Sequence, residues 1–262
     1  MRGRVLIVAG SDSGGGAGIQ GDIKTVTVLG GYAMTAITAL TAQNTLGVHG
    51  VLAVPPAFLR LQIDCVMDDL GADAFKLGML DSAALIETAA ECLGRHPAVP
   101  LVLDPVMVAK GGHRLLADDA VATLKRSLLP LATLLTPNLP EAEALSGMPI
   151  GSVDDMRRVA DALLTLGVPA VLLKGGHLLG EEVTDLLATE EGCEAFTAPR
   201  IATRHTHGTG CTLASAVATG LAQGQELREA VLRARDYVRR AMEAAPGYGA
   251  GAGPLNHGAG LV

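Results

Sequence analysis

Short apolar runs recur along the chain, and stretches that fit helices lie between them. Each run is rich in Val, Ile or Leu and is bounded by Gly, Pro or Asp. Runs that are apolar on both faces are typical of strands covered by helices on two sides. Strands are therefore predicted over residues 5–9, 34–40, 74–77, 101–104, 132–135 and 170–174.

The intervening stretches predict helices over residues 16–29, 56–69, 82–94, 118–128, 153–166, 210–223 and 227–244. Strands that alternate with helices form a mostly parallel sheet with right-handed crossovers. Two further runs, 183–189 and 193–197, flank Glu190-Glu191-Gly192 and predict a hairpin. Such a hairpin would add an antiparallel edge to the parallel sheet.

Nothing along the chain marks a boundary between domains. It contains no internal repeat, no low-complexity tract and no Pro/Ser-rich linker, and 262 residues can form one large domain. The Gly-rich stretch 247–262 is expected to be a coil laid over the body. We predict a single domain over residues 1–262.

Composition narrows the classes of partner. Aromatic residues make up 2% of the chain and the formal net charge is −7, which argues against a nucleic-acid surface or attraction to anionic lipid. No apolar stretch approaches the about 20 residues that a membrane helix needs. The four cysteines form no CxxC pair, which favours free thiols in a reducing compartment, so a cytoplasmic protein is expected.

The first glycine-rich segment, residues 14–21, resembles two nucleotide-binding patterns without matching either. Residues 16–21 match GxGxxG, but a dinucleotide fold needs an acidic residue roughly 20 positions later, and none stands between Asp22 and Asp64. A phosphate-binding Walker loop fails because Asp22 stands where Lys is required. What remains is a turn that brings backbone close to a ligand, or simply a flexible turn that opens a helix.

A second cluster passes from the polar loop Thr206-His207-Gly208 into an Ala-rich helix. Backbone N–H groups converge at a helix N-terminus, and Gly208 and Gly210 would let a phosphate approach the amides, Thr209 included. Cys211 is expected in the first turn, where the helix dipole lowers the pKa of a thiol and prepares it to take a proton from a hydroxyl. The plainer alternative is a small buried cysteine at a helix start.

Charged residues follow three other predicted strands. Lys174 precedes Gly175-Gly176 and could meet a phosphate as a point charge, although a solvated strand end explains it equally well. Asp104 and Glu141 are expected at the carboxyl edge of the sheet, where they could hold Mg²⁺ through waters. Asn138 and Glu141 also fit a helix capping box, and the two roles are compatible.

Two histidines close together, His205 and His207, raise the possibility of a metal site with the distant His49. An HxH pair without a nearby third ligand more often reflects the polarity of a loop than zinc. The sequence therefore predicts no zinc site here.

Several long segments, in one order, resemble the hydroxymethylpyrimidine/phosphomethylpyrimidine kinases of thiamine biosynthesis, in the ribokinase superfamily. The resemblance covers nearly the whole chain, including the ending Gly253-Pro254-Leu255-Asn256-His257. The segments that carry it are Ala9-Gly10-Ser11-Asp12-Ser13-Gly14-Gly15-Gly16-Ala17-Gly18-Ile19-Gln20, Thr38-Ala39-Leu40-Thr41-Ala42-Gln43-Asn44-Thr45, Lys76-Leu77-Gly78-Met79-Leu80, Leu103-Asp104-Pro105-Val106-Met107-Val108-Ala109-Lys110, Thr136-Pro137-Asn138-Leu139-Pro140-Glu141-Ala142 and His207-Gly208-Thr209-Gly210-Cys211-Thr212-Leu213.

The resemblance implies a ribokinase-like three-layer α/β/α sandwich that uses ATP and Mg²⁺, forms a homodimer and phosphorylates a pyrimidine alcohol and then its monophosphate. It implies substrate contacts for Gly10, Asp22, Gln43, Met79 and Val106, with Gln43 at the aminopyrimidine edge. It implies phosphate or nucleotide contacts for Lys174, Asn138, Thr209 and Gly210. It places Mg²⁺ near Asp104 and Glu141, and gives catalytic roles to Cys211, Lys174, Gly208 and Gly210.

One segment departs from the family pattern. Gly111-Gly112-His113-Arg114 stands where the family more often has Ser-Gly-Asp, and Arg114 would add a positive charge to that loop. Two other functions stay open at this point. One is a pyridoxal or pyridoxine kinase of the same superfamily, and the other is a sensor that binds a heterocycle without catalysis.

Overall fold

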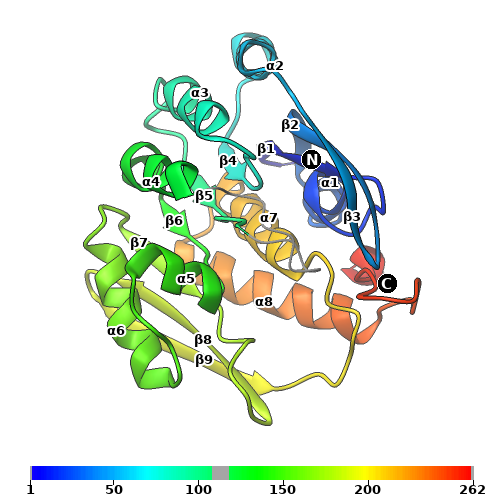
Figure 1. The fold of residues 1–262 in the computed structure, drawn as a ribbon, viewed down its shortest axis with the longest axis vertical. Coiled ribbons are helices and arrows are strands. Elements are labelled where there is room, and N and C mark those ends of the chain that lie inside the picture. The colour runs from blue at the N-terminus through cyan, green and yellow to red at the C-terminus, as the bar shows by residue number, and fades with distance from the viewer. Residues whose placement is uncertain (1, 108–117, 261–262) are drawn as a thin grey trace.

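The structure is a computed structural model, and it describes residues 2–107 and 118–260. Within these residues nine strands form one sheet in the order β3-β2-β1-β4-β5-β6-β7-β8-β9 (Figure 1). The strands are β1 Arg4–Asp12, β2 Tyr32–Asn44, β3 Gly47–Ala53, β4 Ala74–Leu77, β5 Leu101–Leu103, β6 Leu134–Leu135, β7 Ala170–Leu173, β8 Glu182–Thr189 and β9 Gly192–Pro199.

The middle of the sheet is parallel and both of its edges are antiparallel. Strands β2, β1, β4, β5, β6 and β7 pair in parallel, whereas β3 pairs antiparallel with β2, and β8 and β9 extend the other edge antiparallel. The predicted hairpin edge is confirmed. Strand β3 was not predicted, because five of its seven residues are exposed and it lacks the alternation of a half-buried strand.

Helices cover both faces and make three layers (Figure 1). Helices α1, α7 and α8 pack on one face, against strand residues such as Val5 and Ile7. Helices α2 to α6 pack on the other face, against alternate residues such as Leu6 and Val8. The helices are α1 Gly18–Val28, α2 Pro56–Asp69, α3 Ala83–Leu93, α4 Asp118–Ser127, α5 Leu139–Ser146, α6 Val153–Leu164, α7 Thr209–Ala222 and α8 Leu227–Glu243.

The predicted helices all occur, with small differences at their ends. Helix α5 was not among them, because eight residues are too few to show helical periodicity, although its capping box was recognised. The tail is not coil throughout: a 3-10 turn, η2, covers His257–Gly260 and packs on α8. The loop with Gly111 to Arg114 lies outside the described residues. Within the described part, no helix is long and apolar enough to cross a membrane.

Candidate active site

A cavity of about 1410 Å³ lies beyond the carboxyl ends of the parallel strands. That is where ligands bind in open α/β sheets. Most of the predicted site residues line it together: Gly10, Gln43, Met79, Asp104, Val106, Asn138, Glu141, Lys174, Gly208, Thr209, Gly210 and Cys211. Asp22 is the exception, since it is fully buried and does not line the cavity.

The start of helix α7 provides the amides of the predicted anion hole. Gly208 precedes the helix with φ +86°, and a Cβ there would lie 1.9 Å from the carbonyl oxygen of Gly16. Only glycine fits this position without displacing the Gly-rich loop. At Gly210 a Cβ would lie 3.1 Å from Lys174 Nζ and 3.5 Å from Asp104 Oδ2. The missing side chain therefore leaves the approach to these charged groups open.

An ion pair stands opposite Gly210. Lys174 Nζ donates to Asp104 Oδ1 at 3.0 Å, and both side chains are largely buried. Burial alone would lower the pKa of Lys174, but Asp104 and Glu141 nearby raise it, so the ammonium group keeps its proton. A persistent cation at the end of β7 suits the phosphate role predicted for Lys174.

Glu141 lies beside this pair at the start of α5. Its carboxylate accepts from Asn138 N at 2.8 Å, and Asn138 Oδ1 accepts from Glu141 N at 3.0 Å, which completes the predicted capping box. Burial raises the pKa of Glu141 to about 7, although the charge of Lys174 opposes this shift. A carboxyl with such a pKa gains or loses its proton near neutrality.

The donor set fits Mg²⁺ better than it fits a caged metal. Among residues 2–107 and 118–260, no group of three or more His, Cys, Asp or Glu side chains could enclose an ion. Mg²⁺ usually keeps several waters and is held by one or two carboxylates together with substrate phosphates. Asp104 and Glu141, which both line the cavity, can supply those carboxylates.

The Cys211 thiol does not have the pKa that its place at a helix start predicted. Burial raises its pKa to about 11, against the opposing charge of Lys76 and a backbone hydrogen bond from Gly18. The prediction of a lowered pKa is wrong for the protein without ligands, because loss of hydration outweighs the helix amides and the cation. The thiol is therefore protonated before substrate and nucleotide bind.

Lys76 lines the same cavity, and no function was predicted for it from the sequence. Its ammonium group donates to Asp22 Oδ2 at 2.8 Å, and neither side chain has any exposed surface. Ser215 Oγ donates to Asp22 Oδ1 at 2.7 Å. Asp22 thus holds a lysine beside Cys211. The signal was a lysine inside the apolar run Ala74–Leu77, where a charge needs a partner.

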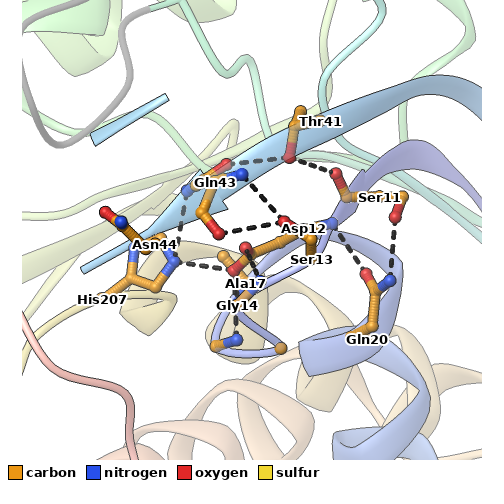
Figure 2. A network of polar contacts seen from close by, with 12 residues as sticks. Ser11, Asp12, Ser13, Gly14, Ala17, Gln20, Thr41, Gln43, Asn44 and His207 are labelled. Atoms are coloured by element: carbon orange, nitrogen blue, oxygen red, sulfur yellow. Dashed lines mark hydrogen bonds and ion pairs between the residues drawn. The ribbon is translucent and has the colours of Figure 1, made fainter. Parts of the chain in front are cut away.

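The opposite end of the cavity contains a network of polar groups (Figure 2). Asp12, at the end of β1, accepts from three amides of the Gly-rich loop, at Gly14, Gly16 and Ala17. His207 Nε2 reaches the same carboxylate at 2.8 Å, and Gln43 lies next to that histidine. The network joins the Gly-rich loop, strand β2 and the loop before α7 around Gln43.

Asp12 and His207 stand in family motifs, but no function was predicted for Asp12, and His207 was considered only as a metal ligand. Burial would raise the pKa of Asp12, but the hydrogen bonds from His207 and from the amides of Ala17 and Gly14 lower it below its usual value. Asp12 is therefore an ionised carboxylate at neutral pH. An aspartate two residues before a run of glycines is a pattern of loop capping that could have suggested this role.

Known proteins are similar to this chain over nearly its whole length. A family model described as phosphomethylpyrimidine kinase matches residues 12–256. A hydroxymethylpyrimidine/phosphomethylpyrimidine kinase of Bacillus subtilis is 49% identical over 255 residues, which cover 97% of this chain and 94% of that protein. A thiamine biosynthesis bifunctional protein of Geobacter sulfurreducens is 54% identical over 256 residues, 98% of this chain. The match covers 52% of that longer protein.

Among solved structures, an ADP complex of a Bacillus subtilis pyridoxal kinase is similar, with a TM-score of 0.92 and 38% sequence identity. The match covers 99% of this chain and 98% of that one. The expected ribokinase-like α/β/α sandwich, with a mostly parallel sheet and an antiparallel edge hairpin, is thereby confirmed.

Proposed function

This chain belongs to the phosphomethylpyrimidine kinase family, and we propose that it makes two successive phosphoryl transfers from ATP. The first acceptor is 4-amino-5-hydroxymethyl-2-methylpyrimidine, and the second is the monophosphate formed from it, which becomes the diphosphate used in thiamine biosynthesis. The observation that carries the proposal is one cavity lined by Gln43 at one end and by Lys174, Asp104 and Cys211 at the other.

The end of the cavity lined by Lys174, Asp104 and Cys211, here called the transfer end, suits phosphoryl transfer. That reaction depends mainly on in-line positioning and on neutralising spread negative charge. In the proposed assignment, Lys174 binds ATP phosphate, and the amides of Gly208 to Cys211 hold the transferring phosphoryl group. Thr209, Gly210 and Asn138 line the same cavity and are proposed to contact the phosphates. Bound Mg²⁺, held through Asp104 and Glu141, would supply further charge neutralisation.

The two acceptors make different demands on Cys211. An alcohol must lose a proton as it attacks, and the Cys211 sulfur is the proposed acceptor of that proton. Lys76 favours the thiolate that this role requires, because its charge lowers the pKa of Cys211 against the effect of burial. A phosphate monoester has a second pKa of about 6 and is already largely an anion near pH 7. The second transfer should therefore need the anion-binding groups more than it needs the base.

The end of the cavity around Gln43 is here called the recognition end. The proposed heterocycle site lies there and is lined by Gln43, Gly10, Met79 and Val106. A Cβ on Gly10 would lie 3.3 Å from the Met79 sulfur, so these two residues pack closely. Apolar lining residues beside one amide suit an aminopyrimidine ring. Asp22 does not line the cavity, and its proposed role is to hold Lys76 beside Cys211 at the transfer end.

We further propose one domain over residues 1–262, a homodimer and a cytoplasmic location.

Among the solved structures, the pyridoxal kinase in its ADP complex supports the second candidate function, phosphorylation of a vitamin B6 alcohol. A non-catalytic sensor is disfavoured, because Asp104, Glu141, Lys174 and Cys211 all line one cavity. A sensor would not need them together.

The test is turnover of three acceptors with MgATP: the aminopyrimidine alcohol, its monophosphate and pyridoxal. The proposed function predicts transfer to both pyrimidines and formation of the diphosphate, followed by phosphorus NMR. Phosphorylation of pyridoxal alone, with the pyrimidine monophosphate left unchanged, would show a pyridoxal kinase instead. If none of the three acceptors is phosphorylated, the non-catalytic sensor is favoured.

A further inference from the structure

The side-chain amide of Gln43 is held between two polar groups (Figure 2). On one side it lies 3.4 Å from His207 Nε2, and on the other it lies 3.2 Å from Thr41 Oγ1. The backbone of Gln43 is held as well, because Ser13 Oγ accepts from its N–H at 2.8 Å and donates to its carbonyl at 2.9 Å. A register shift in the β2–β3 pairing falls between Ala42 and Gln43.

The protonation of His207 is determined by its partner. Asp12 is ionised and can only accept hydrogen bonds, and three of its contacts are backbone N–H groups. The fourth, at 2.8 Å from Asp12 Oδ2, is His207 Nε2, which must therefore carry a hydrogen. This holds for a neutral ring and for an imidazolium alike. This nitrogen then has no lone pair left to accept a hydrogen bond from Gln43. Its single hydrogen points to Asp12 and can only be shared with a second acceptor, so the Gln43 atom nearest to His207 should be the amide oxygen.

The hydrogen of the Thr41 hydroxyl is also committed. Thr41 Oγ1 lies 2.8 Å from the carbonyl oxygen of Ser11, which can only accept. The hydroxyl has one hydrogen, so it meets Gln43 with its lone pairs. The Gln43 atom nearest to Thr41 should therefore be the amide nitrogen, which donates.

Both neighbours require the same orientation of the amide. In Figure 2 the side-chain nitrogen of Gln43 faces His207 Nε2, a protonated nitrogen that cannot accept a hydrogen bond from it. A half-turn of the amide exchanges its oxygen and nitrogen with no other movement, and it then accepts from His207 and donates to Thr41. The oxygen and nitrogen each keep one further hydrogen-bonding position for a ligand in the cavity.

We propose that the Asp12–His207 pair and the Thr41 hydroxyl are positioning residues that fix the Gln43 amide in this orientation. The amide then offers an acceptor on the His207 side and a donor on the Thr41 side. That order selects a heterocycle whose amino group stands next to a ring nitrogen, with the amino group toward His207. The proposal deepens the proposed function, on which it rests, by naming what sets the direction of the pyrimidine ring.

The test replaces the hydroxyl of Thr41 and varies the amino group of the substrate. Thr41→Val removes the acceptor for the Gln43 nitrogen, and Thr41→Ser keeps it. Each variant and the wild type are assayed with the aminopyrimidine alcohol and with the analogue in which hydrogen replaces the amino group. Loss of one neutral hydrogen bond corresponds to roughly a 3- to 10-fold effect.

We expect Thr41→Val to raise KM for the aminopyrimidine by that factor, with kcat little changed and the analogue unaffected. Thr41→Ser should match the wild type. Equal losses for both substrates, or an unchanged preference in Thr41→Val, would overturn the proposal. The wild-type assay tests the proposed function separately, since failure of the wild type to phosphorylate the aminopyrimidine would defeat that function. In that case, calorimetry with the two ligands would still measure the preference for the amino group in the wild type and in Thr41→Val.

Nitrogen NMR of the histidine side chains gives an independent readout, with His207→Gln used to assign the signal. A protonated Nε2 on His207 agrees with the proposal. The tautomer protonated at Nδ1 alone would contradict it, because His207 would then present an acceptor to Gln43.

Discussion

The two ends of the cavity use different kinds of group. At the transfer end, buried charges stand in ion pairs: Lys76 with Asp22, and Lys174 with Asp104. At the recognition end, the neutral amide of Gln43 and the hydroxyl of Thr41 line the cavity, and the charge of Asp12 is directed to its own loop and to His207. Charges neutralise a phosphoryl group from any direction, whereas neutral donors and acceptors distinguish one heterocycle from another.

The largest effect expected at the transfer end is on the alcohol step. Cys211→Ala should lower phosphorylation of the pyrimidine alcohol by roughly 10²–10⁴, the usual range for loss of a general base. The monophosphate step should fall much less, because its acceptor is already an anion. Steady-state kinetics on both acceptors measures this, with Cys65→Ala, an exposed cysteine on α2, as the control. Equal losses in the two steps would exclude a proton-accepting role.

The buried pair behind Cys211 should matter for folding as well as for rate. Lys76→Met leaves Asp22 without its partner inside the protein, which costs about 3–5 kcal/mol of unfolding free energy. Urea denaturation would measure it. Adding Asp22→Asn removes the isolated charge and keeps an acceptor for Ser215. The double variant should regain most of the stability but not the alcohol activity. Recovery of both would mean that Lys76 has no effect on Cys211.

Glu141 should make the Mg²⁺ requirement depend on pH. Its pKa in the folded protein is raised to about 7, so a proton competes with the metal below that pH. The Mg²⁺ concentration for half-maximal activity should rise about tenfold per pH unit below 7 and level off above it. Glu141→Gln, which can still complete the capping box, should need more Mg²⁺ at every pH and lose this dependence. The same slope in both proteins would remove Glu141 from the metal site.

The smallest effect concerns the recognition end and is one of stability. Asp12→Asn replaces an ionised acceptor of the loop amides and of His207 with a neutral one, at a cost of about 1–3 kcal/mol at pH 7. The pKa of Asp12 is lowered in the folded state, so its contribution is present above the unfolded value and is lost as pH falls through the folded one. Denaturation of both proteins from pH 7 to pH 3 should show the difference closing. A difference that stays constant down to pH 3 would contradict this account.

The sequence predicted the strands and helices whose pattern of apolar and polar residues reflects their burial. Strand β4 and helix α2 occur at the predicted residues, because their apolar and polar positions follow the core. Strand β3 is exposed along most of its length and helix α5 has only eight residues, so neither shows a periodic pattern of apolar residues. The site was predicted largely through family motifs, since the cavity gathers residues from strand ends far apart in the chain.

What the sequence could not supply was the balance of opposing effects at single groups. The helix dipole at Cys211 was visible in the sequence, but the burial that raises the pKa of its thiol was not. Asp22 carried a family role, yet its place behind Lys76 depends on the packing of α1 against β1, the strand next to β4. The Asp12–His207 contact joins residues 195 positions apart, and no local pattern announces it.

The central claim is that one cavity serves two acceptors with different needs for a base. The most direct test is the pH dependence of kcat for each acceptor in the wild-type protein at saturating Mg²⁺. The alcohol rate should keep rising with pH through the neutral range, because the pKa of the Cys211 thiol is about 11 before ligands bind. The monophosphate rate should level off once its phosphate, with a second pKa of about 6, is ionised. Parallel profiles for the two acceptors would contradict the claim.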